Sequence, residues 1–340
     1  MTGRNPFLVL LLFICANVGV CAAQDSAPLT LVETISRPGV QRKWDHFRVD
    51  LTGHRLFVAS EIEPVVEVFD LRTNKLVHIV TGLKKPHNIL LRTDLKKIFV
   101  VDGEASEIKV LQSESYKLLD RIALSIDADP IAYDPESKLL YVVNGGREAH
   151  TPYCLVSVVD TSQSKKLADI KLDTNRLEAM ALEKAGDRLF VNMTGVNEVG
   201  VIDRQQRKVI ATWPITAGAV NSPMQLDEAD HRLFVVTRKP AMLVVFDTQT
   251  GHEIANVPVG GGTDDLAYDA VHRRLYAPSA DGFITVVEQQ SADKYRVLGN
   301  VPTAAGAKTA LLVPELNRYY VGVPSKENQQ AGILVFSVGN

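Results

Sequence analysis

The sequence "RLFVA" at residues 55–59 returns along the chain in related forms, and these repeats decide the fold. The related forms are "KIFVV" (97–101), "LLYVV" (139–143), "RLFVN" (188–192), "RLFVV" (232–236), "RLYAP" (274–278) and "RYYVG" (318–322). The aromatic member of each unit recurs every 42 to 49 residues, at Phe57, Phe99, Tyr141, Phe190, Phe234, Tyr276 and Tyr320. A period of this length indicates a repeat architecture of seven units.

Each unit carries further apolar segments that are typical of short strands. An alternating segment such as "EVGVID" (198–203) follows most aromatics, and after a turn comes another, such as "KVIATW" (208–213). One more segment precedes the aromatic, as in "LAYD" (266–269). Four strands in about 42 residues is typical of a propeller blade. We therefore predict an all-β, seven-bladed β-propeller with four-stranded antiparallel blades, formed as a single domain by residues 24–340.

The two ends of this repeat region predict how the ring closes. The seventh unit stops after its third strand, at residues 333–338, while residues 29–36 form a spare strand ahead of the first unit. Pairing of these two segments would remove a free sheet edge, which otherwise invites aggregation. We expect the N-terminal strand to complete the last blade.

Residues 1–23 read as a secretory signal peptide. Arg4 precedes an apolar run at residues 7–20, and Cys21, Ala22 and Ala23 come before the expected cleavage point at Gln24. The run is shorter than the roughly 20 residues that a bilayer span needs. We expect a periplasmic or secreted protein with no membrane span after cleavage.

Composition narrows the choice of partners. Cleavage would leave Cys154 as the single cysteine, so no intrachain disulfide could form. A net charge of −3 offers no general attraction to nucleic acid, which we do not expect as a partner. A monomer is expected.

Three segments resemble a known family. "LLYVVN" (139–144), "EVGVIDRQQRKVIATWPI" (198–215) and "LVVFDTQTGHEIANVPV" (243–259) resemble the YVTN-repeat β-propellers, specifically the YncE-like exported bacterial proteins. The resemblance extends from about residue 29 to the end, although the string Tyr-Val-Thr-Asn itself does not occur. It implies a propeller fold and export. It leaves the activity open, because such propellers serve binding, scaffolding and enzymatic roles.

Two sets of residues lie where the first strand of each blade should reach one mouth of the central channel. Counting twelve residues back from each repeat aromatic gives the mouth ring: Asp45, His87, Asp129, Glu178, Ser222, Asp264 and Lys308. Counting eleven back gives a second set: His46, Asn88, Pro130, Ala179, Pro223, Asp265 and Thr309. Since strand side chains alternate, one set should face the mouth, and its charge favours the mouth ring. A twist at the strand start would let both contribute.

Metal binding is one hypothesis for these residues. Asp45, Glu178 and Asp264, with Asn88 as a neutral oxygen donor, would suit calcium. Imidazole donors from His46 and His87 would shift the preference towards zinc. Charged groups at a channel mouth are also common as purely structural features, so the pattern alone does not establish a site.

Other residues near this mouth are secondary candidates. Asp265 is expected to cap a turn or pack locally, and Arg238 could meet an anionic ligand. His150 and Cys154 share an unusually long loop at residues 144–154. A nucleophilic cysteine needs a base in contact, so a buried, unreactive thiol is the favoured interpretation.

These observations favour an exported, non-enzymatic propeller that binds through its loop-bearing mouth. The partner would be a protein, a cell-wall component or a small polar ligand. The alternative is a lactonase-like hydrolase with a central metal, in which a ring carboxylate or His87 acts as base. A quinone or redox propeller is least favoured, because only Trp44 and Trp213 could stack on a cofactor.

Overall fold

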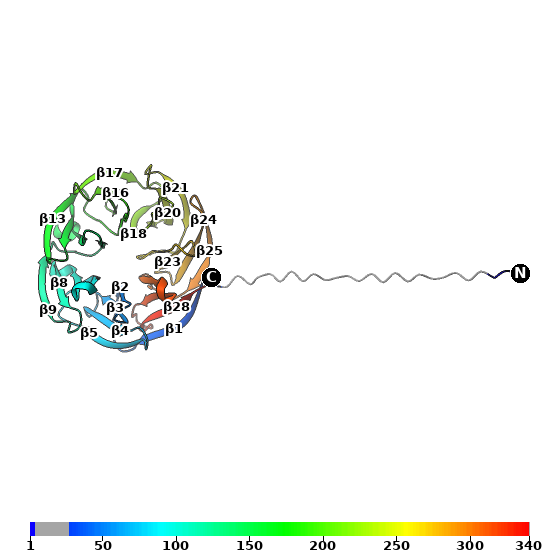
Figure 1. The fold of residues 1–340 in the computed structure, drawn as a ribbon, viewed down its shortest axis with the longest axis horizontal. Helices are drawn as coiled ribbons and strands as arrows, with labels where there is room; N and C mark the ends of the chain where they lie inside the picture. The colour runs from blue at the N-terminus through cyan, green and yellow to red at the C-terminus, as the bar shows by residue number, and fades with distance from the viewer. Residues whose placement is uncertain (4–26, 340) are drawn as a thin grey trace.

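The computed structural model describes residues 1–3 and 27–339. Its strands form seven four-stranded sheets arranged as blades in a ring (Figure 1). This confirms the predicted seven-bladed propeller. The expected signal peptide falls largely on residues 4–26, which lie outside the described residues. Within the described part of the chain, no helix has the length and apolar character that a membrane crossing requires.

Each blade runs from an inner first strand to an outer fourth strand. Blades one to three consist, in chain order, of β2 (Trp44–Asp50), β3 (Arg55–Ser60), β4 (Val65–Asp70) and β5 (Lys75–Val80); β6 (Pro86–Arg92), β7 (Lys97–Asp102), β8 (Glu107–Gln112) and β9 (Leu118–Ala123); β10 (Ile131–Asp134), β11 (Leu139–Gly145), β12 (Cys154–Asp160) and β13 (Lys165–Leu172).

Blades four to six follow the same order. They are β14 (Met180–Leu182), β15 (Arg188–Met193), β16 (Glu198–Asp203) and β17 (Lys208–Pro214); β18 (Ala219–Asp227), β19 (Arg232–Lys239), β20 (Ala241–Asp247) and β21 (Glu253–Pro258); β22 (Ala267–Asp269), β23 (Arg274–Ser279), β24 (Phe283–Ser291) and β25 (Lys294–Pro302). Short 3-10 helices lie in the turns at η1 (Thr93–Leu95), η2 (Gly103–Ala105), η3 (Gly146–Ala149) and η4 (Pro314–Leu316).

The seventh blade combines both ends of the chain. It consists of β26 (Ala310–Val313), β27 (Arg318–Val323), β28 (Ala331–Val338) and the N-terminal strand β1 (Leu29–Arg37). β1 pairs antiparallel with β28 along its length, from Leu29 opposite Val338 to Arg37 opposite Ala331. The predicted closure by the N-terminal strand is therefore confirmed.

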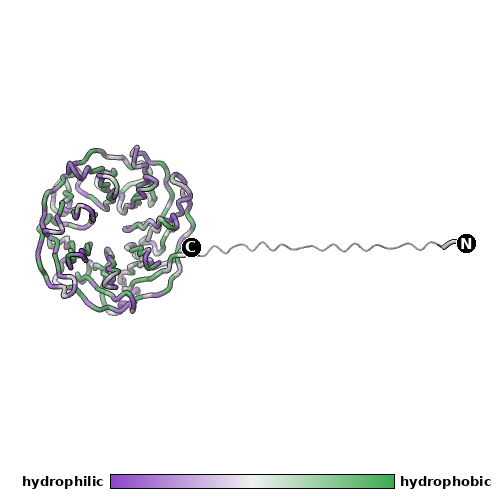
Figure 2. Tube along the Cα trace, viewed as in Figure 1, coloured by the Kyte–Doolittle hydropathy of each residue, from purple (hydrophilic) through white to green (hydrophobic). Residues whose placement is uncertain are grey.

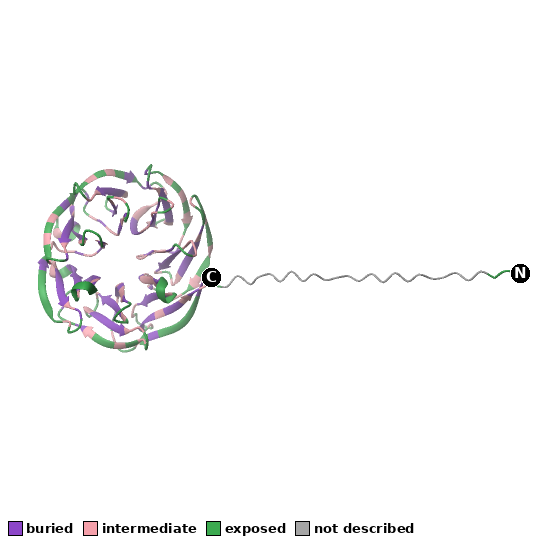
Figure 3. Cartoon of the chain, in the orientation of Figure 1, coloured by how far each residue is buried: buried purple, intermediate pink, exposed green. Residues whose placement is uncertain are grey.

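The repeat aromatics form the cores between blades. Each lies in the second strand of its blade and is at most 3% exposed. Phe57, for example, packs with Ile98 and Val100 of the next blade. Tyr320 packs with Leu56 and Val58, so the same contact joins blade seven to blade one. Hydropathy alternates along the strands (Figure 2), and exposed residues concentrate on the outer strands (Figure 3). One buried aromatic per unit thus fixes each blade against its neighbour.

A buried carboxylate also ties the closing strand to blade one. Glu67 in β4 is fully buried and accepts hydrogen bonds from the guanidinium groups of Arg37 and Arg42. Arg37 ends β1, and Arg42 lies in the link between β1 and β2. We call these three residues the closure clasp.

Aspartates at the far end of the first strands, such as Asp269, accept hydrogen bonds from the backbone of the turns that follow. Asp269 Oδ1 accepts the backbone N–H of Val271 at 3.0 Å. Asp50 and Asp134 accept equivalent bonds from Gly53 and Glu136.

Candidate functional site

β-bulges shape one end of the central channel. In blade one, Trp44 pairs with Ser60 and Phe47 pairs with Val58, so Asp45 and His46 together lie opposite Ala59. β6 is irregular between Pro86 and Asn88, and β18 between Asn221 and Met224. A bulge interrupts the alternation of side chains and re-aims them. Neighbouring residues at these strand starts can therefore face the same side of the sheet.

These strand starts line a cavity of about 970 Å³ along the central channel. All seven residues of the mouth ring lie in its wall. Six residues of the second set lie there too, namely His46, Asn88, Pro130, Ala179, Pro223 and Asp265. The expectation that only one set would face the channel is wrong. Bulges break the regular pleat in blades one, two and five, and in blades three, four and six both residues lie ahead of the first strand, where no pleat applies. The alternative that a twist at the strand start lets both sets contribute agrees better with the structure.

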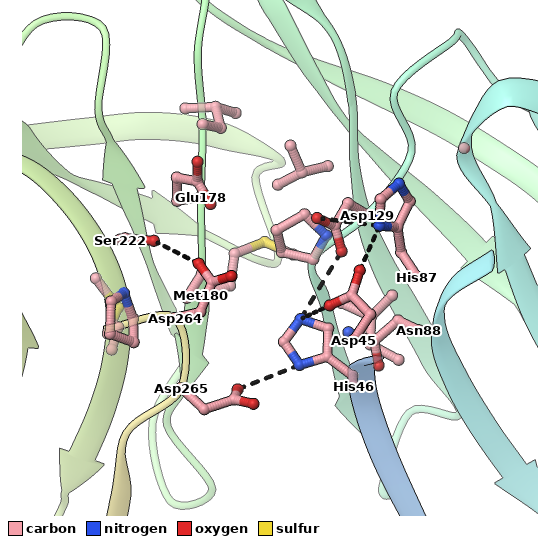
Figure 4. Close-up of a pocket in the computed structure, with 18 of the residues that line it drawn as sticks. Asp45, His46, His87, Asn88, Asp129, Glu178, Met180, Ser222, Asp264 and Asp265 are labelled. Atoms are coloured by element: carbon pink, nitrogen blue, oxygen red, sulfur yellow. Dashed lines mark hydrogen bonds and ion pairs between the residues drawn. The ribbon is translucent and has the colours of Figure 1, made fainter. Parts of the chain in front are cut away.

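Five of these residues form an imidazole–carboxylate cluster, with Asp45, His46, His87 and Asp129 from blades one to three and Asp265 from blade six. His87 Nδ1 lies 2.5 Å from Asp45 Oδ2 and 3.7 Å from Asp129 Oδ2. His46 Nε2 lies 3.6 Å from Asp45 Oδ1 and 3.8 Å from Asp129 Oδ1. On its other side, His46 Nδ1 lies 3.2 Å from Asp265 Oδ1. Figure 4 shows His46 between these three carboxylates.

Burial and charge shift the pKa values within this cluster. Burial alone would lower the pKa of His46, but the carboxylates of Asp265, Asp45 and Asp129 raise it well above its ordinary value. Burial also opposes the charged form of His87, yet Asp129 and Asp45 raise its pKa to about 9. Burial, helped by the charge of Asp45, raises the pKa of Asp129 to about 7 against the pull of His87. Strongly perturbed groups that share a cavity are typical of functional sites, although structural networks also produce them.

The opposite wall of the mouth carries ion pairs with Arg and Lys. Asp264 contacts both Arg238 Nη2 and Lys308 Nζ. The same Arg238 Nη2 donates a hydrogen bond to Ser222 Oγ at 3.0 Å. Burial would lower the pKa of Lys308, but the Asp264 carboxylate raises it. These residues form a second polar wall, which we call the Asp264 wall.

Glu178 lies on this side as well and has a partner that the sequence did not suggest. Arg176 Nη2 lies 2.6 Å from Glu178 Oε1. Burial raises the pKa of Glu178 despite that pairing. Arg176 stands two residues before Glu178 in the loop ahead of β14, and both line the cavity.

The four metal ligands predicted from the sequence are not brought together. Asp264 and Glu178 are engaged by the basic groups just described. Asn88 Oδ1 accepts the backbone N–H of Ile89 at 3.1 Å. Across the described residues, two groups place three donor atoms within 4.8 Å of one another: Asp45 with His46 and Asp129, and Asp45 with Glu61 and His87. The capacity to hold a metal therefore lies in the imidazole–carboxylate cluster and the adjacent Glu61.

The two candidate residues in the long loop of blade three, His150 and Cys154, lie in different surroundings. His150 is exposed and lies outside the cavity lining. Cys154 lines the cavity but is only 2% exposed, and burial raises the pKa of its thiol to about 11. A raised thiol pKa disfavours the thiolate, which is the nucleophilic form.

Glu61, which follows β3 on the same mouth, was missed by counting along first strands alone.

Comparison with known proteins identifies the fold more clearly than the role. No family model matches the sequence. The uncharacterized protein YncE of Salmonella typhi is 24% identical over 185 residues, and that of Salmonella typhimurium is 24% identical over 183. Each match spans 53% of this chain and 46% of the relative, so the chain matches less than half the length of these relatives.

Solved structures match over most of the chain. A chain of Kuenenia stuttgartiensis hydrazine synthase has a TM-score of 0.74 at 17% identity, covering 84% of this chain and 95% of its own. U3-55K has a TM-score of 0.73 at 10% identity, covering 92% and 99%. These TM-scores show that the fold is shared, and identities this low carry no information about activity.

Proposed function

We propose that this chain is an exported YVTN-repeat propeller of the YncE-like kind, and that it binds a small polar ligand, a cell-wall component or a protein through its channel mouth. The repeat strings and the similarity to YncE over half the chain support the family assignment. The signal-peptide pattern of residues 1–23 supports export to the periplasm or beyond.

The observation that carries the binding role is the cavity in which both residue sets meet. Its wall joins the imidazole–carboxylate cluster to the Asp264 wall, so donors and acceptors of both signs surround one space of about 970 Å³. Many are already paired with each other, which lowers the cost of ordering them around a ligand. A few fixed polar groups converging on a concave site are typical of small-ligand recognition.

A thermal-shift screen tests this role. The purified protein would be screened against soluble muropeptides, dipeptides, amino acids and sugars. We expect a ligand that raises the melting temperature of the wild type and not of the site variant D45N/E178Q/D264N. The control E136Q/D187N/E315Q removes three exposed carboxylates from turns at the opposite end of the ring and should respond like the wild type. Loss of the response in the control alone would show that the wrong mouth has been chosen.

A metal-dependent hydrolase of lactonase-like kind is the second candidate. The observation that favours it is the convergence of Asp45, His46 and Asp129 beside the open cavity. A cation there could polarise a carbonyl and activate water. Hydrolysis of a series of γ- and δ-lactones by zinc-loaded protein, abolished in Asp129→Asn, would support it. Absence of hydrolysis over the whole series would remove it.

A further inference from the structure

Three donor atoms of the imidazole–carboxylate cluster converge at the wall of the central cavity. His46 Nε2 lies 3.6 Å from Asp45 Oδ1 and 3.8 Å from Asp129 Oδ1, and the three donors lie within 4.8 Å of one another. Ligands about 2.1 Å from a tetrahedral zinc ion are separated by about 3.4 Å. Shifts of a few tenths of an ångström would bring His46 Nε2 to that spacing from each carboxylate oxygen, and the two oxygens already lie within 4.8 Å of each other.

Asp265 orients the imidazole ring of His46. Asp265 Oδ1 lies 3.2 Å from His46 Nδ1, on the side of the ring away from Asp45 and Asp129. The other oxygen of Asp265 accepts the backbone N–H of Ala310 at 2.8 Å, which fixes the carboxylate. A metal-ligating histidine almost always donates its second ring N–H to such a group. This arrangement leaves Nε2 as the ring nitrogen that faces the two carboxylates, where it could bind a metal once its proton is displaced.

A second observation concerns Asp129. Its Oδ1 is buried and has no hydrogen-bond partner, whereas Oδ2 faces His87 Nδ1 at 3.7 Å. A buried acceptor without a partner loses the free energy of hydration and gains nothing in exchange. The unpartnered oxygen is the one that faces His46 Nε2. A cation at this point would satisfy it.

The neighbouring group of Asp45, Glu61 and His87 is less suited to a metal. Glu61 is engaged by Lys43 at 2.6 Å and lies 3.7 Å from Lys85. His87 Nδ1 is in direct contact with Asp45 Oδ2 at 2.5 Å. Glu61 is therefore paired with lysines outside the group, and His87 Nδ1 is paired with Asp45 inside it, while His87 Nε2 is buried without a hydrogen-bond partner.

We propose that Asp45, His46 and Asp129 bind a divalent transition metal such as zinc, that Asp265 is a positioning residue, and that the remaining coordination positions open onto the cavity. Two carboxylates balance the charge of the cation. The imidazole nitrogen favours zinc-like metals over calcium, which takes six to eight oxygen ligands. The site is independent of the binding role proposed above, because a protein can retain a metal without binding any other ligand.

Metal titration of the purified full-length chain tests the site. After treatment with a chelator, the wild type should bind one zinc ion per chain in calorimetry, and cobalt should give a visible spectrum of a nitrogen–oxygen site. His46→Gln and Asp129→Asn should each weaken zinc binding by at least about tenfold. Failure of the folded wild type to bind zinc would overturn the proposal whatever the variants do.

Two further variants separate this proposal from a general loss of structure. Asp265→Asn can still accept the Ala310 N–H, so its melting temperature should hold while zinc affinity falls by about 10–100-fold. Glu178→Gln removes a carboxylate from the same cavity outside the cluster and should leave zinc affinity unchanged. An equal loss in Glu178→Gln and Asp129→Asn, or displacement of zinc by millimolar calcium, would overturn the assignment.

Discussion

Replacing Glu67 by glutamine should destabilise the whole ring, because Glu67 is the acceptor of the closure clasp. Its carboxylate is fully buried and accepts four hydrogen bonds of 2.8–2.9 Å from Arg37 and Arg42. The Arg42 side chain is only 5% exposed, so its Nε and Nη2, which donate to Glu67, would be left buried against a neutral amide. Breaking a buried pair from one side costs about 3–5 kcal/mol.

That cost translates into a measurable melting shift. At about 2.1 cal/mol/K per residue, a ring of about 310 residues has an unfolding entropy of about 0.65 kcal/mol/K, so the melting temperature should fall by about 5–8 °C. Differential scanning calorimetry of both proteins provides the measurement.

A matched control uses the other partner of the same arginine. Glu63 also pairs with Arg42, but its side chain is 53% exposed. Exposed pairs contribute about 0–1 kcal/mol, so Glu63→Gln should lower the melting temperature by no more than about 2 °C. If Glu67→Gln and Glu63→Gln lower the melting temperature equally, burial of Glu67 does not determine the strength of the clasp, and the reasoning is refuted.

Three further predictions concern the ring and its mouth. Deletion of residues 24–36 should unfold the ring in a single transition at lower temperature, since blade seven loses its outer strand; an unchanged calorimetric transition would contradict closure. In Gly103→Ala the new Cβ would lie 2.8 Å from His87 Cδ2, so we expect a loss of about 1–3 kcal/mol, and unchanged urea unfolding would argue against this packing. Since burial raises the pKa of Cys154 to about 11, its thiol should react with iodoacetamide at pH 8 at least about 100-fold more slowly than in urea. Keeping this thiol neutral should stabilise the folded protein fully below about pH 8.5, and this stabilisation should be lost as the pH rises towards 11. Fast alkylation of the folded protein at pH 8 would contradict the raised pKa of Cys154.

The fold could be predicted because its determinants repeat. One aromatic per unit, such as Phe57 or Phe190, packs between blades, and its period directly reports the number of blades. The spare strand at residues 29–36 has the counterpart that it needs at residues 333–338. Packing of this kind depends on local pattern and strand count, both of which a single sequence carries.

The site could be predicted only in part because bulges are not periodic. Counting from the aromatics located the mouth ring, but it assumed a regular pleat and so separated Asp45 from His46. The prolines at residues 86 and 223 were an available signal, since proline within a strand is often found at bulges. The pairing of Asp264 with Arg238 and Lys308 joins three different blades, and no spacing along the chain specifies such a contact.

A crystal structure of the protein with a ligand from the thermal-shift screen would test the central claim most directly. We predict density for the ligand in the central cavity, in contact with both the imidazole–carboxylate cluster and the Asp264 wall. A ligand bound at the opposite end of the ring or on the outer strands would contradict the claim that the bulged mouth is the binding site.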